Sequence, residues 1–186
     1  MDKEMNISAI IGIDPGGAGG IAVFIPGCNV KVAKMPKDVR NLRDFFEYYA
    51  ENYKPIVFIE KLSVRPDDVI MKDDKAAMGK LYRIQHMMAN YEHLIAMIET
   101  FEIPYVRVHP ISWQTKLKLR VKGEKIEKAQ RKRNYQNKAA SLYPEVKVTL
   151  WNADALLIMH FGRWALMNDK KWVKEQLPER EYQKLF

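Results

Sequence analysis

Short apolar runs, each followed by turn-forming residues, predict the first strands of this protein. Residues 8–14 (SAIIGID) form such a run, and it ends in the sequence Asp14-Pro-Gly, which is typical of a buried strand entering a turn. Residues 21–25 and 30–35 are two further strand-like segments, and a Pro-Gly pair separates them. The chain is therefore expected to begin with a three-stranded meander.

A second pattern, in which apolar residues recur every three or four positions, predicts helices. Residues 37–52 are amphipathic, and residues 74–101 keep helical spacing over their whole length without a proline, which indicates one long helix. Shorter helices are expected at 110–113 and at 150–168. The polar segment 63–74 is expected to be an exposed loop.

Two more apolar runs predict a fourth strand at 55–60 and a fifth at 104–109. Helical connections lead into both strands, so they are expected to lie parallel to the first strand. We therefore predict an α/β protein with a ribonuclease-H-like fold, a mixed five-stranded sheet flanked by helices. The whole chain, 1–186, is expected to be one domain, with its core at about 8–168 and a charged tail at 169–186.

Composition adds an expectation about the partner. Apolar residues make up 47% of the chain, and Lys and Arg outnumber Asp and Glu by 31 to 23, a formal charge of +8 that favours a polyanion such as nucleic acid. No apolar run is long enough to span a bilayer, so we expect no membrane partner and a cytoplasmic location. Cys28 is the only cysteine, so a metal ion would need oxygen or histidine ligands.

Three acidic residues are the strongest candidates for chemistry. Asp14 and Glu60 each end a predicted strand, and Asp154 lies near the start of the last predicted helix, where it could face the same strand ends. Converging carboxylates suit Mg²⁺ or Mn²⁺, and two such ions can promote hydrolysis of a phosphodiester. Taken singly, Asp14 could be a turn former and Asp154 a helix-dipole residue, whereas Glu60 has little structural reason to follow four apolar residues.

A basic block at 116–138 holds ten Lys or Arg residues against two glutamates, and Gly123 is expected to break it into a loop and a helix. It could bind phosphates flanking a cut site, or it could be a solvated helix face. The candidate DNA contacts are Arg65, Lys116, Lys118, Arg120, Lys122, Lys125, Lys128, Arg131, Lys132 and Arg133.

Five segments, in this order, resemble the RuvC-type Holliday-junction resolvases of the ribonuclease-H-like superfamily, especially their phage and prophage relatives: IGIDPGGAGGIAVF, VFIEKLSVRP, GKLYRIQHMMANYEHLIAMIE, VHPISWQ and NADALLIMHFGRW. The resemblance implies a homodimeric, Mg²⁺-dependent endonuclease that makes symmetric nicks across a four-way junction in DNA recombination and repair. Asp14, Glu60 and Asp154 would be its catalytic metal ligands, with two Mg²⁺ per site and Mn²⁺ able to substitute. The resemblance further implies a bacterium or a phage-infected host cell as the setting.

The sequence also departs from this family. A fourth acid usually stands three or four residues before the position of Asp154, where this chain has Trp151 and Leu150. Asn152 is a candidate fourth ligand, ahead of His160, although both could be structural. An aromatic residue that the family places soon after the strand-four glutamate is also missing here.

Trp113 is expected in the core, and the stripe from Met78 to Ile98 is expected to form both core and dimer interface, with Met88 and Tyr91 at the contact. An actin-like or sugar-kinase ATPase is a poor alternative, because such proteins need a second nucleotide-binding lobe, so no nucleotide cofactor is expected. A non-catalytic protein that binds branched DNA and retains the fold is the main alternative.

Overall fold

The computed structural model describes residues 6–64, 74–120, 123 and 126–185, and side chains are described at all of these positions except 74–77 and 184. The strands are β1 (Ala9–Ile13), β2 (Gly20–Phe24), β3 (Lys31–Lys34), β4 (Pro55–Glu60) and β5 (Tyr105–Val108). The helices are α1 (Val39–Asn52), α2 (Asp74–Thr100), α3 (Pro110–Lys116), α4 (Lys128–Leu142), α5 (Ala153–Asn168), α6 (Lys170–Gln176) and α7 (Glu179–Leu185).

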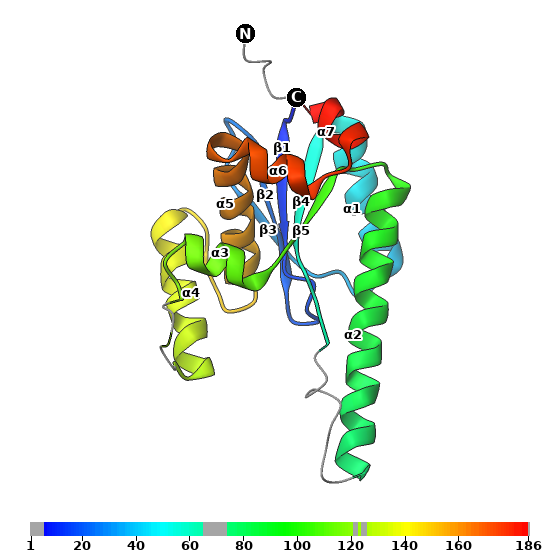
Figure 1. Cartoon of the computed structure of the whole chain (residues 1–186), viewed down its shortest axis with the longest axis vertical. Coiled ribbons are helices and arrows are strands. Elements are labelled where there is room, and N and C mark those ends of the chain that lie inside the picture. The colour runs from blue at the N-terminus through cyan, green and yellow to red at the C-terminus, as the bar shows by residue number, and fades with distance from the viewer. Residues whose placement is uncertain (1–5, 65–73, 121–122, 124–125, 186) are drawn as a thin grey trace.

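The strands form one mixed sheet in the order β3-β2-β1-β4-β5. β1, β2 and β3 pair antiparallel, as the predicted meander requires, whereas β4 pairs parallel with β1 and β5 pairs parallel with β4. The prediction of a mixed five-stranded α/β sheet flanked by helices is therefore confirmed. The helices form two layers, with α3, α4, α5 and α6 on one side of the strands and α1 and α2 on the other (Figure 1).

Helix α5 lies directly on the centre of the sheet. A methyl group built at Gly12 of β1 would lie 2.3 Å from the backbone nitrogen of Met159 and 2.5 Å from the carbonyl oxygen of Ala155, so only glycine permits this approach. Gly162 provides the same room for the ring of Phe58 on β4. The two glycines let α5 pack closely against β1 and β4.

Helices α1 and α2 cover the opposite face with a second apolar core. Tyr91, Leu94 and Ile98 of α2 are buried there, as is Phe46 of α1. The N-terminal half of α2 extends beyond the end of the sheet (Figure 1), and Met78, Leu81 and Tyr82 there are exposed. The expected apolar stripe is therefore core only in its C-terminal part.

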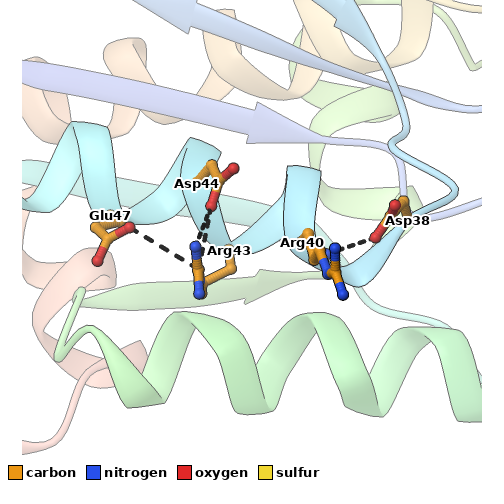
Figure 2. A network of polar contacts seen from close by, with 5 residues as sticks. All are labelled: Asp38, Arg40, Arg43, Asp44 and Glu47. Carbon is orange, nitrogen blue, oxygen red and sulfur yellow. Dashed lines mark hydrogen bonds and ion pairs between the residues drawn. The ribbon is translucent and has the colours of Figure 1, made fainter.

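The outer surface of α1 carries a local polar network with no connection to the acidic residues singled out above. The Asp38 carboxylate caps the helix by accepting a hydrogen bond from the Arg40 backbone N–H at 2.7 Å. The guanidinium of Arg43 lies 2.7 Å from Asp44 and 3.9 Å from Glu47 (Figure 2). All of these side chains are solvent-exposed, so the network contributes little to stability and marks a solvated helix face.

The chain after residue 168 folds into two helices that the sequence patterns did not predict. Val173 of α6 is fully buried, and Leu177 and Leu185 also join the core next to α5. The segment that was expected to be a charged tail therefore extends the core past residue 168. Each of these helices spans only about two turns, which is too short for helical spacing of apolar residues to stand out in the sequence.

Smaller differences concern helix ends. α5 begins at Ala153, three residues later than expected, and α3 continues to Lys116. Gly123 adopts a positive φ of 87°, which fits the predicted break in the basic block, and α4 follows from Lys128. In the described part of the chain, no helix has the length and apolar character required to cross a membrane.

Candidate metal centre

The three acidic residues meet at one end of the sheet. Asp14 directly follows β1, and Glu60 is the last residue of β4. Gly12 pairs with Phe58 in the parallel register, so the next residues on that face, Asp14 and Glu60, reach the same level. Asp154 lies in the first turn of α5, which packs on this face. Strand register and helix packing therefore bring together the carboxylates that the sequence had placed on separate elements.

Glu60 is held in an environment that disfavours its charge. Burial, reinforced by the negative charge of Asp14, raises the pKa of the Glu60 carboxyl to about 7. The indole N–H of Trp113 on α3 opposes this effect, since it donates a hydrogen bond to Oε2 of Glu60 at 2.9 Å. Glu60 is therefore oriented by a fully buried aromatic residue and would gain from a nearby cation.

Asp154 is paired with a lysine. Its side chain is 7% exposed, and Nζ of Lys132 on α4 lies 2.5 Å from Oδ2. Burial still raises the pKa of the Asp154 carboxyl, although the Lys132 charge acts in the opposite direction. The other oxygen, Oδ1, is buried without a hydrogen-bond partner. A buried carboxylate oxygen with no donor is poorly solvated, and a metal ion is one group that could satisfy it.

Asp14 is shaped by the turn that follows it. Its Oδ1 accepts a hydrogen bond from the Gly16 backbone N–H at 3.1 Å, and its own N–H donates to the carbonyl of Gly20 at 3.0 Å. Asp14 therefore does stabilise the turn, as one interpretation of the sequence predicted. This contact leaves the carboxylate free for a further role in the acidic group (Asp14, Glu60 and Asp154), because a carboxylate can accept more than one interaction.

Asp14, Glu60 and Asp154 offer carboxylate oxygens to a divalent cation. In the part of the chain that the structure describes, no three His, Cys, Asp or Glu side chains lie close enough to hold a metal ion as they stand. The electrostatics nonetheless favour a cation, because Asp14 raises the pKa of both Glu60 and Asp154, and Oδ1 of Asp154 lacks a partner. Hard carboxylate oxygens are the ligands that Mg²⁺ and Mn²⁺ prefer, so the donor set fits.

The two candidate substitutes for a fourth acid have other partners. Asn152 is fully buried; its Oδ1 accepts from the Thr149 backbone N–H at 2.8 Å, and its Nδ2 donates to the carbonyl of Lys147 at 3.1 Å. Its amide therefore braces the loop before α5, which weighs against the hypothesis that Asn152 is a metal ligand. Nδ1 of His160 lies 2.9 Å from the hydroxyl of Tyr143, on the side of α5 that faces α4. Each side chain therefore has a partner within the fold, and a role for either one as a metal ligand stays a prediction.

Two of the candidate basic residues make specific contacts within the protein. Lys132 pairs with Asp154, and the ammonium of Lys116 lies 3.4 Å from the centre of the Trp164 ring on α5. The remaining candidates with described positions have exposed side chains: Lys118, Arg120, Lys128, Arg131 and Arg133. Arg65, Lys122 and Lys125 lie outside the described residues. DNA contact by these side chains stays a prediction.

Sequence reasoning did not predict two parts of this centre. Trp113 was expected only in the core, but it also donates to Glu60, and Lys132 was expected to contact DNA, but it pairs with Asp154. Lys132 precedes Asp154 by 22 residues, and Trp113 follows Glu60 by 53. No local spacing rule connects residues so far apart, so only the packed fold could reveal either pair.

No family model matches the sequence, and no curated protein matches it either. The fold is similar to that of Thermus thermophilus RuvC solved in complex with a Holliday junction substrate, with a TM-score of 0.51 and 14% sequence identity over 86% of this chain and 96% of that chain. A second structure of Thermus thermophilus RuvC gives a TM-score of 0.49 at 15% identity, with the same coverage of both chains. At such low identity the first of these shows a shared fold. This chain therefore has the ribonuclease-H-like α/β architecture that is also found in RuvC.

Proposed function

We propose that this protein is a metal-dependent endonuclease that resolves four-way DNA junctions by paired nicks. The observation that carries the proposal is the meeting of Asp14, Glu60 and Asp154 at the carboxyl ends of β1 and β4, on the face covered by α5. The likeness to RuvC supports it at the level of the fold, and that RuvC structure was solved with a Holliday junction substrate. The placement within a phage or prophage branch stays a prediction.

Asp14, Glu60 and Asp154 would hold Mg²⁺ or Mn²⁺, two ions per site by resemblance, and these would supply the positive charge needed for phosphodiester hydrolysis. Trp113 orients the Glu60 carboxylate through its 2.9 Å hydrogen bond and favours the charged form. Lys132 neutralises Asp154 while no other cation is near. The same ammonium is positioned to stabilise negative charge on a phosphate that approaches the acidic group.

Paired nicks require two copies of the site. We propose a homodimer, because a two-fold symmetric junction calls for two active sites related by the same symmetry. The N-terminal half of α2 is the candidate contact, since Met78, Leu81 and Tyr82 are 69%, 47% and 62% exposed. Grouped apolar side chains of this size on a projecting helix are typical of a protein interface. Tyr91, by contrast, is 2% exposed and packs in the core of its own subunit.

The exposed Lys and Arg side chains of the basic block form a basic surface that suits the proposed substrate. Burial raises the pKa of the Tyr135 hydroxyl to about 12, and the nearby guanidinium charges of Arg131 and Arg120 oppose this rise. Phosphates that flank the cut strand could contact these guanidinium groups, and binding should weaken steeply as salt concentration rises.

A non-catalytic protein that binds branched DNA is the alternative function. Two observations favour it: Trp151 stands where an acid is usual in the family, and Lys132 already neutralises Asp154. Such a protein would bind junctions through the same basic surface and would not need metal ions.

The decisive experiment is a nicking assay on an end-labelled synthetic four-way junction, with Mg²⁺, Mn²⁺ or a chelator and without nucleotide. We expect symmetric nicks in two strands of like polarity, only when metal is present, and no cutting of a linear duplex of the same sequence. Tight junction binding without nicks at any Mg²⁺ or Mn²⁺ concentration would instead establish the non-catalytic alternative. Failure to bind junctions in preference to duplex would reject both.

A further inference from the structure

Trp151 occupies a gap that a glycine leaves in the sheet. A methyl group built at Gly20, the first residue of β2, would lie 2.9 Å from Cε3 and 3.0 Å from Cζ3 of the Trp151 ring. Gly20 pairs with Lys34 of β3, whose side chain therefore lies on the same face of the sheet. The Lys34 ammonium is 5.9 Å from the ring centre. The indole thus packs against the first residue of β2, with a lysine of β3 beside it.

The contact joins the chain segments that carry two of the acidic residues. On one side, the carbonyl of Gly20 accepts the hydrogen bond from the Asp14 N–H at 3.0 Å. On the other side, Trp151 directly precedes Asn152, whose buried amide braces the turn that leads into α5 and hence to Asp154. A continuous series of contacts therefore runs from Asp14 through Gly20 and Trp151 to the first turn of α5.

We propose that Trp151 is a positioning residue, which locks the turn between β1 and β2 to the start of α5 and so keeps Asp14 and Asp154 in register. The inference rests on the proposed nuclease function for its purpose but not for its geometry. Trp151 touches no reacting group in this scheme. Three acids that must approach one another against their mutual repulsion need a scaffold that resists separation, and a large aromatic side chain packed on backbone provides one.

The direct test is hydrogen exchange of the Asp14 amide, measured by NMR on the protein without metal or DNA. Trp151→Ala should speed that exchange by about tenfold, because the Asp14 N–H opens locally when the turn loses its support. Trp151→Phe should keep exchange near the wild-type rate. Leu150→Ala is the matched control, since Leu150 lies in the same turn and is 55% exposed.

A second amide separates a local effect from a general loss of stability. The Val57 N–H donates to the carbonyl of Pro104 at 2.9 Å, far along the sheet from Trp151, and its exchange should stay unchanged. Unchanged Asp14 exchange in Trp151→Ala would overturn the proposal. Equal acceleration at Asp14 and Val57 would overturn it as well, because Trp151 would then be an ordinary core residue.

Gly20→Ala gives a reciprocal test. Its methyl group would press on Trp151 and would also lie 3.0 Å from the carbonyl of Ala33. If the ring locks the turn, Gly20→Ala should disturb the Asp14 amide less in the Trp151→Ala background than in the wild type. Equal effects in both backgrounds would show that the two residues act independently and would count against the proposal.

Nicking assays connect the geometry to the proposed function. Trp151→Ala should raise the metal concentration needed for half-maximal nicking by about tenfold, with Trp151→Phe close to wild type. If the wild-type protein never nicks a junction, the proposed function fails while the exchange experiment still decides whether Trp151 locks the turn. If nicking is normal and exchange shows no local effect, only the role of Trp151 is rejected.

Discussion

The ammonium of Lys132 on α4 lies 2.5 Å from Oδ2 of Asp154 on α5. Among the salt bridges of the described residues, only this one has a partner that is mostly buried. The pair couples a helix of the basic block to the acidic group. Its lysine is 35% exposed, so it can move toward solvent or toward a substrate phosphate.

Lys132→Gln should lower the free energy of unfolding at pH 8 by about 1–3 kcal/mol, because it leaves the buried Asp154 carboxylate without its cation. Partial exposure of the lysine keeps the loss below that expected for a fully buried pair. Urea denaturation measures the change. The difference should shrink at acid pH, where Asp154 becomes protonated and no longer needs a cation. Arg133→Gln removes the same charge from the exposed neighbouring position and should change stability by less than about 0.5 kcal/mol. Equal effects of the two variants would contradict a specific role for Lys132.

The raised pKa of Glu60 predicts how stability depends on pH. The pKa is about 7 in the folded protein and near the ordinary value of 4.5 in the unfolded chain, so the folded state binds the proton more tightly. The resulting stabilisation is complete below about pH 4.5 and is lost as the pH rises through about 7, a change of a few kcal/mol at most.

Denaturation of the metal-free protein between pH 5 and 8 measures this dependence. Wild type should lose stability across that interval, and Glu60→Gln, which carries no titrating proton, should show a flatter profile. Addition of Mn²⁺ at pH 8 should restore stability to the wild type more than to Glu60→Gln. Parallel pH profiles for the two proteins would show that Glu60 does not titrate as the structure indicates.

Neutral substitutions of the acidic residues should separate cutting from binding. Asp14→Asn, Glu60→Gln and Asp154→Asn are each expected to reduce nicking by about a hundredfold or more, because each removes a ligand for the metal ions. Junction binding should persist or tighten, since a negative charge next to the phosphate backbone is lost. Gel shifts and nicking assays on one junction measure both properties. Near-normal nicking by any variant would exclude that residue from the site.

The projecting half of α2 predicts where dimerisation can be disrupted. Leu81→Glu or Tyr82→Glu should weaken a homodimer at micromolar concentration with little change in the stability of the monomer, because both side chains are exposed in the single chain. Sedimentation velocity measures the oligomeric state. Tyr48→Glu is a control, since Tyr48 is similarly exposed, at 47%, but lies on α1. A wild-type protein that sediments as a monomer with and without junction DNA would refute the dimer.

The sequence by itself determined the strands, the main helices and the positions of the three acidic residues. It could do so because apolar periodicity is local: a run such as 55–60 reports its own burial, and an acid at its end reports the edge of the sheet. Two parallel strands joined by a helix must also end at the same side of the sheet, so the meeting of Asp14 and Glu60 could be predicted.

Only the tertiary structure decided which groups surround those acids. Trp113 reaches Glu60, and Lys132 reaches Asp154, because α3 and α4 pack next to α5 in a way that no short-range pattern encodes. The helices α6 and α7 are stabilised by burial of a few apolar residues against a core that forms elsewhere in the chain. From the sequence, Asn152 could be either a metal ligand or a structural residue. The fold brings backbone groups of residues 147 and 149 within hydrogen-bond distance of its amide, and this favours the structural role.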